Sequence, residues 1–124
     1  MSHFSTVAVN FTDRDALLAA LQAMGFSPLV HQTAVQLQNS WGTATAEHKA
    51  EIIIPAEVLG SKADIGFAWR DDAWQLIADD YELDEHGQQH FKRELALNYA
   101  LIQAQAAGYQ VIREGNELIA CPLQ

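Results

Sequence analysis

Two apolar runs joined by a pair of aspartates, at residues 63–79 (ADIGFAWRDDAWQLIAD), constrain the fold more than any other part of the chain. Apolar side chains alternate in both runs, which is typical of strands. A two-residue turn at Asp71-Asp72 sets Trp69 opposite Trp74 and makes one face apolar along the whole hairpin. Both tryptophans are therefore predicted to be structural. Asp-Asp is a weaker turn signal than Asn-Gly, so a four-residue loop is the alternative.

The other face of this hairpin carries an unfavourable charge pattern. In the same register Asp64 lies opposite Asp79, and like charges placed directly opposite each other destabilise a sheet. A base from elsewhere, a raised pKa, exposure to water or a bound cation would each relieve the repulsion. Residues 71–85 contain seven acids and no base. We interpret this segment as a solvated acidic rim, with Asp80 and Glu82 as candidate partner contacts.

A cation or ligand site at Asp64 and Asp79 is the alternative interpretation, with His3 as a possible third group. Hard cations such as calcium and magnesium prefer oxygen ligands. The spacing of the acids is not that of an EF-hand calcium loop, which needs acids at alternate positions and a glycine at the sixth.

The whole chain, residues 1–124, is predicted to form a single α+β domain. The first helix begins at Thr12 or Asp13 and ends at Gly25, and the second runs from about Gln88 to Ala107. Besides the hairpin already described, strands are predicted at residues 4–11, 26–37, 51–54, 109–112 and 117–121.

This order, β-α-β-β-β-β-α-β-β, contains two β-α-β units separated by an antiparallel stretch. Right-handed crossovers would place both helices on one face of a mostly antiparallel sheet. The sequence therefore predicts a ferredoxin-like fold or a variant of it. An open edge of such a sheet is a possible route to a homo-oligomer.

The net charge limits the kinds of molecule that this chain is expected to bind. Seven Lys and Arg against sixteen Asp and Glu give a net charge of −9, which argues against nucleic acid because phosphate binders need a basic surface. The single cysteine, Cys121, rules out an internal disulfide and suits a reducing compartment. The N-terminus does not resemble a signal peptide, and no apolar run approaches the ~20 residues of a membrane helix. We expect a cytoplasmic protein without membrane or nucleic-acid partners.

Few other residues suggest a catalytic, metal-binding or partner-binding role. His86 and His90 are four residues apart, but Gly87 weakens the helix that would align them. Cys121 has no neighbouring base that marks it as a nucleophile. Trp41, in a turn with glycine and serine, is a candidate contact for a protein partner. No catalytic residues are predicted, and the sequence indicates no particular cofactor.

The sequence resembles the family called hypothetical chloroplast reading frame 35, which is described as a domain of unknown function. The resemblance rests on MSHFSTV at the start, ADIGFAW at residues 63–69, Asp79 after WQLIA, the helix that contains Tyr99, and the closing GYQV. It implies a plastid stroma or a cyanobacterial cytoplasm and brings no established activity. The positions that characterise the family are Ser2, His3, Phe4, Asp64, Gly66 and Asp79.

These observations favour a non-enzymatic accessory or adaptor domain that binds a protein partner, because no catalytic constellation accompanies the acidic rim and Trp41. The alternative is a small metal- or ligand-binding protein, or an enzyme, with its site at Asp64 and Asp79 and possibly His3.

Overall fold

The computed structural model describes residues 4–37, 48–60, 63–79, 88–115 and 117–122. The strands are β1 (Phe4–Phe11), β2 (Leu29–Gln36), β3 (Lys49–Ile54), β4 (Ile65–Arg70), β5 (Ala73–Asp79), β6 (Tyr109–Glu114) and β7 (Glu117–Pro122). The helices are α1 (Arg14–Ala23), α2 (Ala56–Leu59) and α4 (Gln88–Ala106). The predicted order of the elements is confirmed, with the single turn of α2 added in the connection before β4.

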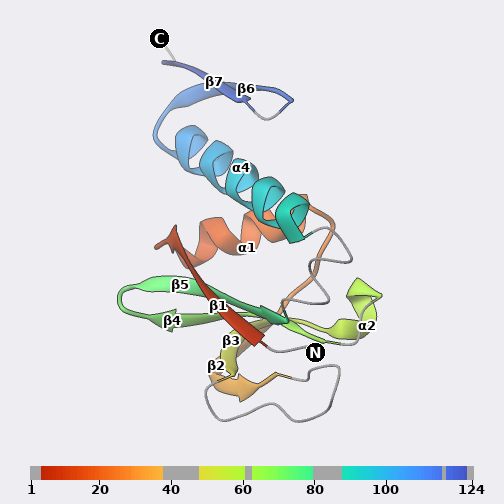
Figure 1. The fold of residues 1–124 in the computed structure, drawn as a ribbon. Coiled ribbons are helices and arrows are strands. Elements are labelled where there is room, and N and C mark those ends of the chain that lie inside the picture. The colour runs from red at the N-terminus through yellow and green to blue at the C-terminus, as the bar shows by residue number, and fades with distance from the viewer. Residues whose placement is uncertain (1–3, 38–47, 61–62, 80–87, 116, 123–124) are drawn as a thin grey trace.

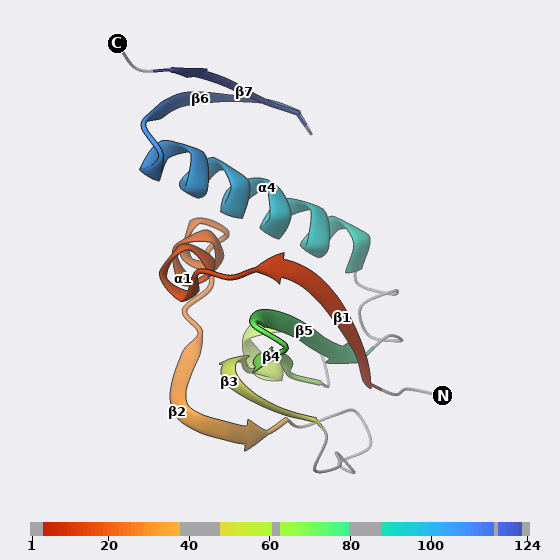
Figure 2. The ribbon, with the colours of Figure 1, turned by 90° about the vertical axis from the view of Figure 1, so that its left-hand side faces the viewer.

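Five strands form one sheet in the order β1-β5-β4-β3-β2, and every neighbouring pair is antiparallel. The chain crosses from one edge strand, β1, to the other, β2, through α1. Helices α1 and α4 both lie on the same side of this sheet (Figures 1 and 2). The predicted α+β class, with two helices on one face of an antiparallel sheet, is therefore confirmed.

The central hairpin has the predicted register. Phe67 pairs with Leu76 and Trp69 with Trp74, and the two turn residues, Asp71 and Asp72, have φ angles of 53° and 62°. Two successive positive φ angles define the type I′ turn that suits the twist of a hairpin. The two-residue turn is thus correct, and the four-residue loop is not formed.

The tryptophan pair at the end of this hairpin is only partly core. The rings of Trp69 and Trp74 meet edge to face, with centroids 5.3 Å apart. Trp74 is buried, whereas Trp69 is 44% exposed. The prediction that both are structural core residues was therefore right for Trp74 and wrong for Trp69. Trp74 pairs with Phe11 of β1, whereas the pairing of β4 with β3 ends at Phe67 and does not reach Trp69.

The main core fills the space between the sheet and the two helices. Its buried side chains come from α1, α4 and every strand of the five-stranded sheet except β2. They are Phe11, Ala16, Leu17, Ala20, Leu21, Ile52, Ile54, Ile65, Phe67, Trp74, Leu76, Ala78, Phe91, Leu95 and Tyr99. The α1 helix begins where it was predicted to, because the Asp13 carboxylate accepts hydrogen bonds from the backbone N–H groups of Asp15 and Ala16.

Tyr99 ties α4 to the loop between β1 and α1. Its hydroxyl oxygen accepts hydrogen bonds from the backbone N–H groups of Thr12 and Asp13, both at 3.1 Å. Its ring lies against Phe11, with centroids 4.7 Å apart. One side chain of α4 therefore fixes the point at which β1 leads into α1.

A second buried cluster lies on the other face of the sheet, where Gly66 allows a close approach. A Cβ atom at Gly66 would lie 2.7 Å from the Cβ of Ala50 and 2.8 Å from the nearest methyl group of Leu37. Leu37, Ala50 and Ile77 are fully or almost fully buried there. This position requires glycine because no space is left for a side chain.

The last two strands do not join the five-stranded sheet. β6 and β7 pair with each other and form a sheet of their own. The hairpin lies on the far side of α4 from the five-stranded sheet (Figures 1 and 2). The second predicted β-α-β unit is therefore incomplete, since α4 leads into a separate hairpin and not back into the sheet that contains β5.

Candidate functional site

The β6–β7 hairpin has two distinct faces, which follow from its register. Val111 pairs with Ala120 and Arg113 with Leu118, and the Arg113 side chain reaches α4. The alternate pairs point the other way. We call this second surface the outer face; it consists of Gln110, Ile112, Glu114, Glu117, Ile119 and Cys121.

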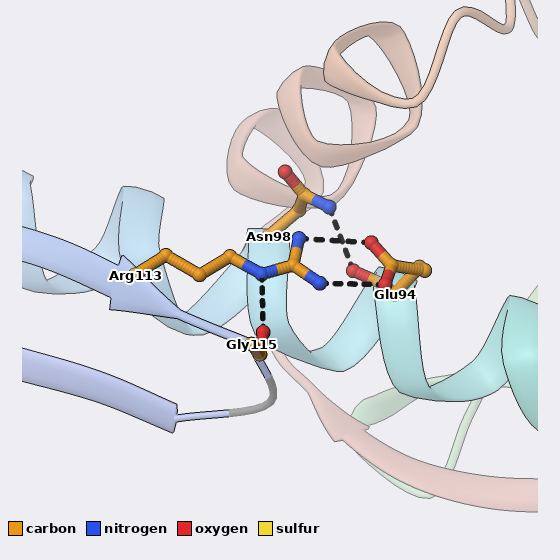
Figure 3. A network of polar contacts seen from close by, with 4 residues as sticks. All are labelled: Glu94, Asn98, Arg113 and Gly115. Carbon is orange, nitrogen blue, oxygen red and sulfur yellow. Dashed lines mark hydrogen bonds and ion pairs between the residues drawn. The ribbon is translucent and has the colours of Figure 1, made fainter.

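An ion pair holds the hairpin against α4. The guanidinium of Arg113 donates from both terminal nitrogens to the carboxylate of Glu94, at 2.8 and 2.6 Å. Its Nε donates to the backbone carbonyl of Gly115, at 2.9 Å. Figure 3 shows this arrangement, in which the Asn98 amide also donates to the carbonyl of Glu94. The bidentate geometry fixes the orientation of the hairpin as well as its distance from α4.

The ion pair changes the titration of both partners. The hydrogen bond from Arg113 is the main cause that lowers the pKa of Glu94, and the charges of Arg113, His90 and Arg93 act in the same direction. The hydrogen bond to Glu94 raises the pKa of Arg113. Both shifts favour the charged forms, in which the two groups attract each other.

The outer face combines exposed apolar and acidic side chains. Ile112 and Ile119 pair directly across the ladder and are 50% and 41% exposed. Glu114 and Glu117 form the next pair on the same face and are also exposed. On the α4 side, by contrast, Val111 is partly buried. A short hairpin with one apolar face against a helix and a second apolar pair in solvent is typical of a surface that another molecule covers.

The edge strand β2 is a second apolar surface among the described residues. Its exposed side chains include Leu29, Val30 and Val35. The pairing of β2 with β3 shifts register between Val30 and Val35, and such irregularities protect an edge from pairing with another strand. The outer face of β6–β7 is therefore the stronger candidate.

Asp64, a predicted ligand residue, has a structural contact. It is 9% exposed, and its carboxylate accepts a hydrogen bond of 2.8 Å from the backbone N–H of Ala56. The cap position of α2 is Pro55, whose side chain offers no acceptor. The carboxylate of Asp64 therefore satisfies the first N–H of this helical turn from outside the helix.

The backbone brings Asp79 and Asp64 to the same end of the sheet. Phe4 pairs with Asp79, at the start of β1 and the end of β5, and Asp64 directly precedes β4. The side chain of Asp79 and the whole of His3 lie outside the described part of the chain. The predicted pairing of the two carboxylates therefore stays a prediction.

Most of the remaining predicted residues are also outside the described part, namely Trp41, Asp80, Glu82 and His86. His90 and Cys121 are described, and both are exposed. Within the described ranges, no group of three or more His, Cys, Asp or Glu side chains lies close enough to hold a metal ion. In the same ranges, no helix has the length and apolar character needed to cross a membrane.

Comparison with known families identifies the family of this chain. The model of the family described as protein of unknown function (DUF1257) matches residues 20–118. The chain belongs to this family. No curated protein matches the chain, and no solved structure matches it. The family match begins within α1, includes α2 and α4, and extends into β7.

The outer face was missed by the sequence reasoning, although a signal for it is present. Both strands of the hairpin carry adjacent apolar residues, Val111-Ile112 in β6 and Leu118-Ile119 in β7. Adjacent apolar residues in a strand point to opposite faces. One face of this hairpin packs on α4, and the other therefore lacks a cover from within the described chain.

Proposed function

We propose that this chain is a non-enzymatic accessory or adaptor domain that binds a protein partner through the outer face of the β6–β7 hairpin. The observation that carries the proposal is the directly paired, half-exposed Ile112 and Ile119. Apolar anchors surrounded by polar residues are characteristic of protein interfaces. The ion pair between Glu94 and Arg113 supports the proposal further, because it presents this face in a fixed orientation.

Site-specific photo-crosslinking in cells of the source organism tests the proposal. A photoreactive phenylalanine analogue at Ile112 is expected to capture one discrete protein, and the same analogue at Asp71 is the matched control on the other hairpin. The double substitution Ile112→Asp/Ile119→Asp, with the analogue placed at Gln110, should abolish the capture. The same products from both hairpins, or capture that survives the double substitution, would reject the proposed site.

We place this role in a cyanobacterial-type cytoplasm or a plastid stroma. The support is the resemblance of the residues around His3 and Asp64 to the plastid and cyanobacterial reading-frame family. Fractionation of source cells with an antibody against the chain tests this placement, and recovery in a membrane or secreted fraction would contradict it.

A ligand or cation site at Asp64 and Asp79 is the second candidate function. It is supported by the register of β1 against β5, which brings Phe4, the residue after His3, opposite Asp79. Metal analysis of the purified protein, compared with the variant Asp64→Asn/Asp79→Asn, tests it. Stoichiometric metal that the double variant loses would support the site, and equal metal content in both proteins would refute it.

A further inference from the structure

We infer that the partner segment bound by the outer face is basic and apolar, with apolar side chains on Ile112 and Ile119 and a Lys or Arg between Glu114 and Glu117. This inference rests on the proposed function and names the chemistry of the partner. It is carried by the juxtaposition of two cross-strand pairs, one apolar and one acidic, on the same face of one hairpin.

The acidic pair is the first step of the argument. Glu114 and Glu117 are directly opposite each other at the end of the ladder, and both are exposed. Like charges in this relation repel each other. A single cation placed between them would interact favourably with both carboxylates, and it would do so beside the apolar pair that supplies the buried area.

The hairpin has no base of its own for this purpose. Arg113 is the single Lys or Arg between residues 109 and 122. Its guanidinium lies on the α4 side, where Glu94 and the carbonyl of Gly115 accept its hydrogen bonds. The cation that complements the outer face must therefore come from another part of the chain or from another molecule.

A second copy of the chain fits this face poorly. Each copy has a net charge of −9, and its outer face offers two carboxylates and no cation. Two such faces brought together would add repulsion between copies to the repulsion within each pair. Charge complementarity therefore favours a different, basic protein.

Binding of two labelled peptides to the full chain tests the inference by fluorescence anisotropy. One probe is acetyl-Lys-Val-Lys-Val-Lys-Val-amide, and the other has glutamate in place of each lysine. The lysine peptide is expected to bind, and more weakly at high salt. The variants Glu114→Gln/Glu117→Gln and Ile112→Thr/Ile119→Thr should each weaken its binding by at least about fivefold.

The matched control is Asp71→Asn/Asp72→Asn, which removes two charges from the other hairpin. Asparagine tolerates the positive φ angles of these positions, so the fold and the binding should be retained. If this control weakens binding as much as Glu114→Gln/Glu117→Gln does, or if the glutamate peptide binds equally well, the inference is overturned. Self-association of the free chain that Ile112→Asp abolishes, measured by sedimentation velocity, would also overturn it, because a second copy would then cover the face.

The two proposals fail in different ways. Crosslinking at Ile112 that persists in Glu114→Gln/Glu117→Gln, together with no preference for the lysine peptide, removes the basic partner and leaves the docking face. Absence of crosslinking at Ile112 removes the proposed function itself.

Discussion

The two hairpins of this molecule share a local pattern and differ in their surroundings. In both, two strands of six or seven residues pair antiparallel across a short turn. The β4–β5 hairpin has a neighbouring strand on each side, β3 and β1, and lies under the helices. The β6–β7 hairpin has one described neighbour, α4, and no third strand among the described residues.

Equivalent cross-strand pairs therefore have opposite roles. Phe67 and Leu76 are almost completely buried, whereas Ile112 and Ile119 are half exposed. Alternation of side chains determines which residues share a face, and the neighbours of the hairpin determine whether that face is core or surface. The first hairpin consequently supports the fold, and the second presents a surface.

The largest expected difference between the hairpins is in the free energy of unfolding. Phe67→Ala should destabilise the protein by about 3–5 kcal/mol, because it leaves a cavity under the helices. Ile112→Thr, which keeps a β-branched side chain, should cost less than about 1 kcal/mol. Urea denaturation measures both values. Similar losses for the two variants would mean that the outer face is buried in the isolated chain, and the comparison would fail.

A smaller loss of stability is expected from a side chain added at Gly66, where the packing around the central hairpin leaves no space. Gly66→Ala should cost about 1–3 kcal/mol, because its new Cβ would clash with Ala50 and Leu37. The double variant Gly66→Ala/Ala50→Gly should lose less than the sum of the single losses, since it returns the space. Denaturation of all three variants tests this, and strictly additive losses would contradict the packing argument.

The register of the central hairpin could be predicted because two local signals agree. Apolar alternation on both sides of Asp71-Asp72 permits one pairing with a continuous apolar face, and aspartate tolerates the positive φ of a type I′ turn. The first helix was predictable for a similar reason, since Asp13 caps it within three residues.

The features that were not predicted depend on distant residues. Asp64 caps a helical turn that begins eight residues earlier in the chain, so its carboxylate looked like an unpaired charge in the sequence. The separation of β6–β7 from the main sheet is also a tertiary effect, because periodicity identifies strands and not the neighbours with which they pair. Trp69 is on the core face of the hairpin by strand alternation, and it is exposed because the pairing of β4 with β3 ends at Phe67, before it reaches Trp69.

Two tyrosines extend the comparison to hydrogen bonds. Tyr99→Phe should destabilise the protein by about 1–2 kcal/mol, because the N–H groups of Thr12 and Asp13 lose their acceptor while the ring still packs on Phe11. Tyr109→Phe, in the exposed β6, is the matched control and should have little effect. Thermal unfolding of both variants gives the result, and equal shifts would show that the Tyr99 hydroxyl is not a fixed link between α4 and α1.

The smallest expected effect is local and concerns the attachment of the β6–β7 hairpin to α4. The folded-state pKa of Glu94 lies below its usual value because Arg113 donates hydrogen bonds to the carboxylate. The ion pair is therefore fully present above the usual pKa of a glutamate, and it is lost as the pH falls through the lowered folded-state value. The NMR signals of the Val111 and Leu118 methyl groups should change from a fixed to an averaged environment over that acidic range.

Glu94→Gln should give the averaged signals already at neutral pH, whereas Glu114→Gln, on the outer face, should keep the parent titration. Identical methyl signals in the parent and in Glu94→Gln at every pH would mean that packing on α4 alone orients the hairpin, and the outer face would then be presented without help from the ion pair.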